Sequence, residues 1–210
     1  MNKTSRWVDL LVLAIISSIA SYAVFAASPA FASSNVTAKT WLYPLIEQPH
    51  ALHLNEIKQQ SDLYDCGIEQ DDEEFCSDEI WYNKTPVKAR MFINQHDIVN
   101  SMTLKAEFNA SAFTDIQLSL RKDGFYVSEV YKLGKRFSVE EQQELFDERT
   151  LDQKLIQFIN QGVVSDPIEV RWRHQQSVVD SKNDVFAQLS SNGEFIEVVF
   201  SHNNQSPLME

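Results

Sequence analysis

Glycine and cysteine are both scarce in this chain of 210 residues, which contains five glycines and two cysteines. Scarce glycine combined with an apolar share of 43% argues for a packed core rather than a low-complexity chain. Basic residues are also too few to balance the acids, because 18 lysines and arginines face 30 aspartates and glutamates. A net charge of −12 repels phosphate backbones and anionic lipid headgroups, so we expect no nucleic-acid partner and no binding to anionic membrane surfaces.

The motifs of common catalytic and nucleotide-binding sites are absent from the sequence. It contains no Gly-x-Ser-x-Gly, no glycine-rich phosphate loop and no dinucleotide-binding fingerprint. His50 and His53 could share a metal ion on one helix face, but no third ligand is evident. His96 beside Asp97 could orient a catalytic base, although neighbouring side chains on a strand point to opposite faces. We therefore expect no catalytic residue, no metal and no cofactor.

The first 32 residues have the three parts of a bacterial export signal. A short basic start precedes an apolar run over residues 10–27, and the triplet Ala30-Phe31-Ala32 follows. Signal peptidase accepts small side chains two residues apart, which predicts cleavage after Ala32. The alternative is an uncleaved inner-membrane anchor through residues 10–27, because the run is close to the shortest that spans a bilayer. The prediction is a periplasmic or secreted protein without membrane contact after cleavage.

The two cysteines, Cys66 and Cys76, are ten residues apart in an acidic segment. In an oxidising compartment they are expected to form a disulfide, since a zinc site needs more ligands and a redox pair is usually Cys-x-x-Cys. Residues 65–79 hold eight acids, too many like charges to bury together, which predicts an exposed loop pinned by the disulfide. The loop could gather oxygens around calcium, but it lacks the EF-hand order. The acids assigned as possible partner contacts are Asp71, Asp72, Glu73 and Glu74.

Apolar and polar residues alternate in several later segments, which is typical of strands with one buried face. Asp123-Gly124 and Asn192-Gly193 are sequences that favour tight hairpin turns, and hairpins make neighbouring strands antiparallel. The predicted strands cover residues 87–94, 102–108, 116–121, 125–131, 168–173, 185–189 and 194–201.

Helices are predicted in two regions. Ser138 with Glu141 forms a capping-box pattern, and Thr150 with Gln153 repeats it, so we expect a helix or helix pair over 138–161. Gly162 is placed to end it in a left-handed conformation. A short helix is expected within residues 52–63, with Pro44 and Pro49 preventing an earlier start. The apolar stripe of the main helix consists of Leu151, Leu155, Phe158 and Ile159.

These elements predict an α+β fold. It consists of a mostly antiparallel sheet of about six strands, with one face covered by the helix or helix pair at 138–161 and a short helical segment before it. The predicted organisation is a signal peptide (1–32), a helical or loop preface (33–64), one α+β domain with the acidic disulfide loop (65–201) and a disordered tail (202–210).

Basic residues gather around the hairpin predicted between residues 116 and 137. We assign Lys132, Lys135 and Arg136 as possible partner contacts, because their separation from the acidic loop would orient a docking protein. Trp172 lies between Arg171 and Arg173, and strand alternation predicts a buried ring with both arginines facing outward.

The sequence therefore favours an exported, non-catalytic module that binds another envelope or secreted protein. Two alternatives remain open. One is a small-ligand carrier with an apolar cavity, and the other is a hydrolase whose site forms only in the fold, around His96, Asp97 or His174. Partner identity and oligomeric state are not defined by the sequence.

Overall fold

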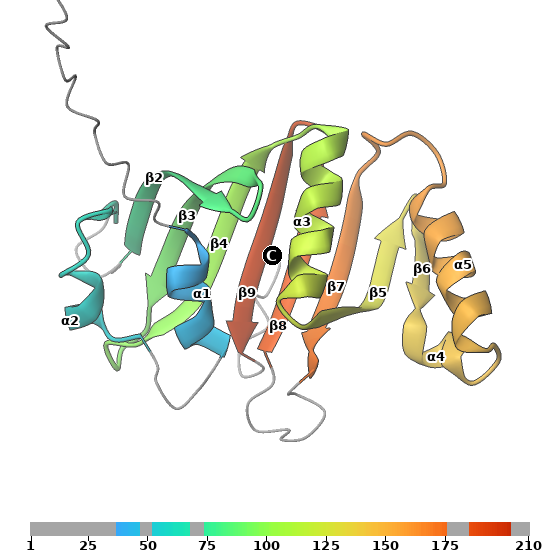
Figure 1. Cartoon of the computed structure of the whole chain (residues 1–210), viewed down its shortest axis with the longest axis horizontal. Coiled ribbons are helices and arrows are strands. Elements are labelled where there is room, and N and C mark those ends of the chain that lie inside the picture. Colours follow the sequence, from blue (N-terminus) through green and yellow to red (C-terminus); the bar gives the residue numbers. More distant parts are fainter. Residues whose placement is uncertain (1–36, 47–51, 68–73, 176–184, 203–210) are drawn as a thin grey trace, which may run out of the picture. The chain divides into compact units, whose positions relative to one another are not determined.

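A single antiparallel sheet of nine strands organises the chain in the computed structural model (Figure 1). The structure describes residues 37–46, 52–67, 74–175 and 185–202, all within one compact unit spanning Asn35–Glu210. The order across the sheet is β1-β2-β3-β4-β9-β8-β7-β5-β6, and each neighbouring pair is antiparallel. The predicted signal, and the predicted tail beyond His202, lie outside the described residues.

The strands are β1 (Leu63–Asp65), β2 (Glu74–Tyr82), β3 (Thr85–Ile93), β4 (Val99–Glu107), β5 (Phe125–Lys132), β6 (Lys135–Ser138), β7 (Ile168–His174), β8 (Val185–Ser191) and β9 (Phe195–His202). The helices are α1 (Lys39–Ile46), α2 (Leu54–Ile57), α3 (Ala110–Lys122), α4 (Val139–Gln143) and α5 (Glu148–Ile159).

The sheet has one covered face and one uncovered face. On β3, Val87, Ala89 and Met91 are buried while the alternating Lys88 and Arg90 are exposed, and β4, β7, β8 and β9 continue the same alternation. In Figure 1, α1 and α3 lie against the covered face, where α3 packs on β3 and β5. Among the described residues, no helix packs against the opposite side, which we call the uncovered face.

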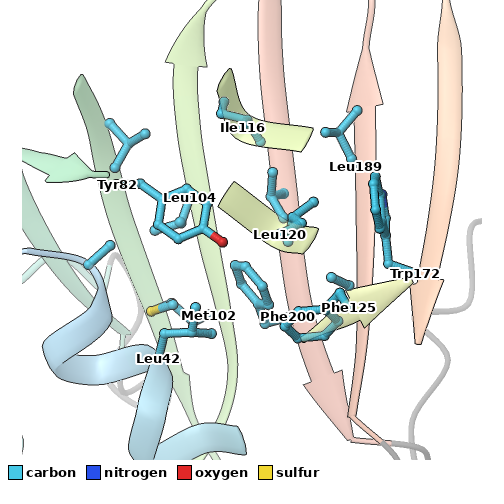
Figure 2. Packing of buried hydrophobic residues seen from close by; sticks show 14 of the residues in the cluster. Leu42, Tyr82, Met102, Leu104, Ile116, Leu120, Phe125, Trp172, Leu189 and Phe200 are labelled. Atoms are coloured by element: carbon cyan, nitrogen blue, oxygen red, sulfur yellow. The ribbon is translucent and has the colours of Figure 1, made fainter. Parts of the chain in front are cut away.

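The core lies between the covered face and the helices. Figure 2 shows Leu42 of α1 beside Met102, and Leu120 of α3 beside Phe125 and Phe200. Trp172 is fully buried, as alternation predicts, and its flanking arginines lie on the uncovered face. Residues of α1 belong to this same core, so the segment before residue 64 packs with the strands that follow it.

The predicted strand at 116–121 is wrong, because this segment is the middle of α3. Asn109 caps the helix by accepting a hydrogen bond from the Ala112 amide at 2.8 Å. Ile116 and Leu120 are buried one helical turn apart, whereas Leu118 is exposed. Asp123-Gly124 consequently follows a helix instead of forming a hairpin turn, and Gly124 has a φ of +88°.

The N-terminal part also differs from the expectation. β1 and β2 include residues assigned to an exposed acidic loop, and a helix begins at Lys39 despite Pro44. The proline is tolerated near the end of this short helix, where its missing amide breaks a single hydrogen bond. Together with β6, these two strands raise the number from about six to nine.

The helix pair after Ser138 is confirmed, with one change at the second start. Ser138 caps α4 by accepting from the Glu141 amide at 3.4 Å. Asp147, not Thr150, caps α5, and its carboxylate accepts from the Thr150 amide at 3.0 Å. The pair packs on β5, so it covers only one end of the sheet, and α1 and α3 cover the centre.

Candidate functional site

Exposed aromatic side chains are concentrated on the uncovered face. Among the described strand residues, all five large apolar side chains that are exposed are aromatic. Their pairing places every one of them on the uncovered face, beside residues such as Arg90 and Arg173. Aromatic residues and arginine are enriched in protein interfaces relative to the remaining surface. The five residues are Tyr64, Trp81, Phe92, Tyr126 and Phe195.

Basic side chains stack on several aromatic rings of this face. The Arg171 guanidinium carbon lies 4.9 Å from the Tyr131 ring centre, and that of Arg173 lies 5.7 Å from Phe186. The Lys105 ammonium is 4.3 Å from the Phe195 ring centre. These cation–π contacts fix the orientation of side chains that would otherwise rotate freely. The uncovered face is therefore partly ordered before any partner binds.

Glu129 is the centre of an ion-pair network on the uncovered face. Arg171 Nη1 lies 3.3 Å from Glu129 Oε2, and Arg136 Nε donates to Glu129 Oε1 at 3.0 Å. Partial burial acts to raise the pKa of Glu129, but hydrogen bonds from Arg136 and Tyr131, with the charges of Arg136 and Arg171, outweigh it and lower the pKa. Glu129 consequently stays ionised at neutral pH, and the bulge between Val127 and Glu129 directs its side chain to this face.

The disulfide between Cys66 and Cys76 is confirmed, and it joins the end of β1 to β2. The two Cα atoms are 5.8 Å apart, within the usual range for a disulfide. Glu74 lies in β2, where it forms an ion pair of 2.9 Å with Arg90 on the uncovered face. Asp71, Asp72 and Glu73 lie outside the described residues.

Replacing both cysteines with serine is expected to destabilise the edge of the sheet without unfolding all of it. The disulfide closes a loop of ten residues, so its loss should lower the free energy of unfolding by about 3 kcal/mol. Thermal unfolding with and without reductant measures this change, and far-UV circular dichroism reports the remaining sheet. A midpoint that does not respond to reductant would contradict the expectation.

The three basic residues assigned as partner contacts occupy different environments. Lys132 is 6% exposed, and its ammonium donates to the Ile159 carbonyl at 2.8 Å. Arg136 is neutralised by Glu129 and Glu141. Lys135 is exposed at the start of β6. Lys132 and Lys135 are cross-strand partners, but the Lys132 ammonium is buried and the Arg136 charge is paired, so the three residues do not form one exposed basic patch.

A buried polar cluster connects α1, β2 and the end of α3. The Asp123 carboxylate, almost fully buried, accepts from Lys39 Nζ at 2.5 Å and from the Tyr82 hydroxyl at 2.9 Å. Burial acts to lower the pKa of Lys39, but its hydrogen bond and charge interaction with Asp123 raise it overall. Burial, followed by the Asp123 charge, raises the pKa of Tyr82, so the phenol remains a neutral donor. These groups satisfy one another in the interior.

The histidines assigned to a possible hydrolase do not form a catalytic arrangement with the predicted partners. His96 and Asp97 are exposed in the turn between β3 and β4, as their position between two strands indicates. His174 is buried, and its Nε2 lies 3.1 Å from the Asp123 main-chain carbonyl oxygen. In the described part of the chain, no group of three histidine, cysteine or acidic residues could hold a metal ion. His50 is outside the described residues.

The apolar stripe of α5 packs closely against the sheet. Leu151, Leu155 and Phe158 are buried, and the Phe158 ring centre lies 5.4 Å from that of Phe137 on β6. A carrier would instead need this stripe to line a cavity of several hundred Å³.

The uncovered face is the feature that sequence reasoning missed. Phe92, Tyr126 and Phe195 occupy the polar phase of their strands, where water-facing side chains are expected. Large aromatic residues at those positions are the sequence signal that could have identified this face.

Comparison with protein families, curated proteins and solved structures finds no match for this chain. Within the described residues, no helix is both long and apolar enough to cross a membrane.

Proposed function

We propose that this chain is an exported, non-catalytic module that binds another envelope or secreted protein through the uncovered face of its sheet. The observation that carries the proposal is that all five exposed aromatic residues of the described strands share that face. Aromatic residues and arginine are enriched among the residues that dominate binding energy at protein interfaces, and an aromatic ring buries a large area while ordering few rotatable bonds.

The dimensions of the face suit a protein partner. Nine strands spaced about 4.8 Å apart give a width of roughly 40 Å, and strands of about eight residues give a length of roughly 25 Å. The product is roughly 1,000 Å², and a standard protein interface buries about 800 Å² on each partner. A small molecule would leave most of this area in water.

The charge of the face favours a partner with mixed charges. Pairing places six basic and six acidic side chains on it, although the chain as a whole is strongly acidic. A balanced face does not repel an acidic or a basic protein, so recognition depends on the positions of individual charges. The basic residues are Lys88, Arg90, Lys105, Arg136, Arg171 and Arg173. The acidic residues are Glu74, Glu79, Glu107, Glu129, Glu169 and Glu197.

Export agrees with the covalent chemistry of the chain. The disulfide between Cys66 and Cys76 is compatible with an oxidising compartment such as the periplasm. The predicted cleavage after Ala32 would release a chain whose first described helix begins at Lys39.

The two alternative functions are less well supported. A hydrolase is disfavoured because His174 contacts a main-chain carbonyl. A small-ligand carrier is disfavoured because the apolar stripe of α5 packs against Phe137.

Replacing Phe92, Tyr126 and Phe195 together with serine is expected to abolish partner binding and to leave the fold intact. These side chains are exposed, so their loss removes interface area rather than core packing. The partner is first isolated from the native envelope with the wild-type protein and purified, and its affinity is then measured by calorimetry. We expect a loss of at least about a hundredfold for the triple variant.

The matched control replaces three exposed residues away from this face, Leu118, Leu145 and Ile156, with serine. It should bind like the wild type, and far-UV circular dichroism should be the same for both variants. Equal affinity of the triple variant and the wild type would disprove docking through the uncovered face. Absence of any stoichiometric partner would disprove the function itself.

A further inference from the structure

Three aliphatic side chains are exposed together at one end of the sheet. Leu133 is 53% exposed, Val163 61% and Val164 54%. Leu133 lies in the turn between β5 and β6, and the two valines lie in the segment that leads from α5 to β7. Both segments are at the same end of the sheet, which is the upper end in Figure 1. We call these three residues the apolar tip.

Leu133 occupies a backbone conformation that disfavours leucine. The turn has two residues, Leu133 and Gly134, between the paired Lys132 and Lys135. Their φ angles are +52° and +71°, as in a type I′ turn, whose first position is usually asparagine, aspartate or glycine. A bulky residue in the left-handed region is strained, and strain of this kind concentrates at functional sites. The exposed side chain gains little burial in return.

The two valines lie in a turn that is ordered by hydrogen bonds. The Val163 amide donates to Asp166 Oδ2 at 2.7 Å, and the Asp166 amide donates to the Val163 carbonyl at 3.0 Å. A Cβ atom on Gly162 would lie 3.1 Å from Leu133 Cδ1, so the two segments touch. The apolar tip is therefore preorganised, and inserting it into a partner would require little additional ordering.

We infer that the apolar tip is an anchor that inserts into an apolar pocket of the same protein that docks on the uncovered face, and this inference rests on the proposed function. Tyr131 of the uncovered face lies on β5, two residues before Leu133 of the turn that follows this strand, which makes the two surfaces adjacent along the chain. Lys135 is exposed beside the tip and forms no ion pair among the described residues. The pocket is accordingly expected to carry a carboxylate on its rim.

Size and charge argue against two other binding partners for the apolar tip, namely a second copy of this chain and a lipid surface. A contact between two tips would involve three side chains from each copy, whereas a stable interface uses about 20–30 residues a side. The acidic net charge of −12 opposes approach to anionic lipid, and a single lysine beside the tip does not offset it. A pocket that receives three aliphatic groups matches the tip better than either surface.

The first test separates binding from stability with Leu133→Asn. Asparagine adopts the left-handed region more readily, so the variant should unfold about 2–4 °C above the wild type while losing the anchor. If Leu133 instead stabilised the fold, replacing it would lower the unfolding midpoint. An unfolding midpoint below that of the wild type would therefore overturn the assignment of Leu133 as a strained anchor.

The second test places a photo-crosslinking phenylalanine derivative at single positions of the full chain in its native cells. Positions 126 and 133 should give a protein adduct of the same mass, and the exposed control position 118 on α3 should give none. Adding Leu133→Asn to the chain probed at 126 should reduce the adduct at least about tenfold. This result would support a shared partner for both surfaces.

The other outcomes distinguish the two proposals. An adduct at 126 without one at 133 would overturn the anchor and leave the proposed function standing. An adduct at 133 with the mass of two chains, or of a chain with a lipid, would overturn the protein pocket in favour of the other occupants. Adducts at neither position would overturn both proposals.

Discussion

Replacing Lys39 with methionine should lower the free energy of unfolding by about 3 kcal/mol, although only one charge on a short helix is removed. The reason is the environment of Asp123, whose side chain is 1% exposed and accepts its charged hydrogen bond from Lys39. Asp123 also follows the C-terminal end of α3, where the helix dipole disfavours a negative charge. Without Lys39, the Tyr82 hydroxyl is the remaining side-chain donor described for that carboxylate.

A double-mutant cycle isolates this effect. Asp123→Asn keeps an acceptor for Tyr82 and removes the buried charge, so Lys39→Met in that background should cost less than in the wild type by about 2 kcal/mol. Denaturant unfolding of the four proteins measures the coupling. A Lys39→Met variant within about 0.5 kcal/mol of the wild type would mean that the pair is solvated and contributes as little as a surface ion pair.

The pairing of Lys39 with Asp123 shows why part of the site could not be predicted. The two residues are 84 positions apart, and neither belongs to a local motif. The sequence places Lys39 in the predicted helical or loop preface (33–64) and Asp123 in a predicted hairpin turn, because Asp-Gly favours turns as well as helix ends. Only the packing of α1 against the end of α3 brings their charged groups together.

Alternation with a period of two predicts β4 and β7 correctly. The segment 116–121 alternates over as many residues as β7, so alternation alone does not separate a strand from a helix here. Ile116 and Leu120 also satisfy the helical spacing of four. Phe113 is also buried and lies one helical turn before Ile116, which favours a helix over a strand for this segment. Short alternation is therefore weak support for a strand.

The missed strands have a different explanation. β2 carries acids that indicate an exposed loop, yet Phe75 and Ile80 alternate with them and are buried. β6 follows a hairpin turn whose first residue is leucine, which no turn preference would select. Both errors occur next to residues of the candidate binding surfaces, where positions are occupied by residues that the fold alone does not favour.

Phe200→Ala should be among the most destabilising single substitutions, with a loss of about 3–5 kcal/mol. Phe200 is fully buried on β9, and its ring centre lies 5.7 Å from that of Phe125 and 6.4 Å from that of Tyr82. Truncation opens a cavity under α3, beside Leu120 (Figure 2), where the surrounding elements have little room to collapse. Thermal unfolding should shift down by roughly 10 °C.

Phe195→Ala on the same strand provides the matched comparison. Phe195 and Phe200 are separated by an odd number of positions on β9, so their rings point to opposite faces of the sheet. The Phe195 ring lies on the uncovered face, where it is 40% exposed and contacts Lys105. Its truncation removes a cation–π contact and little packing, and should cost about 1 kcal/mol or less. Because the two variants delete the same side chain from one strand, comparable losses would show that both faces are buried. If the uncovered face is free to bind a partner, Phe200→Ala must lower the free energy of unfolding much more than Phe195→Ala.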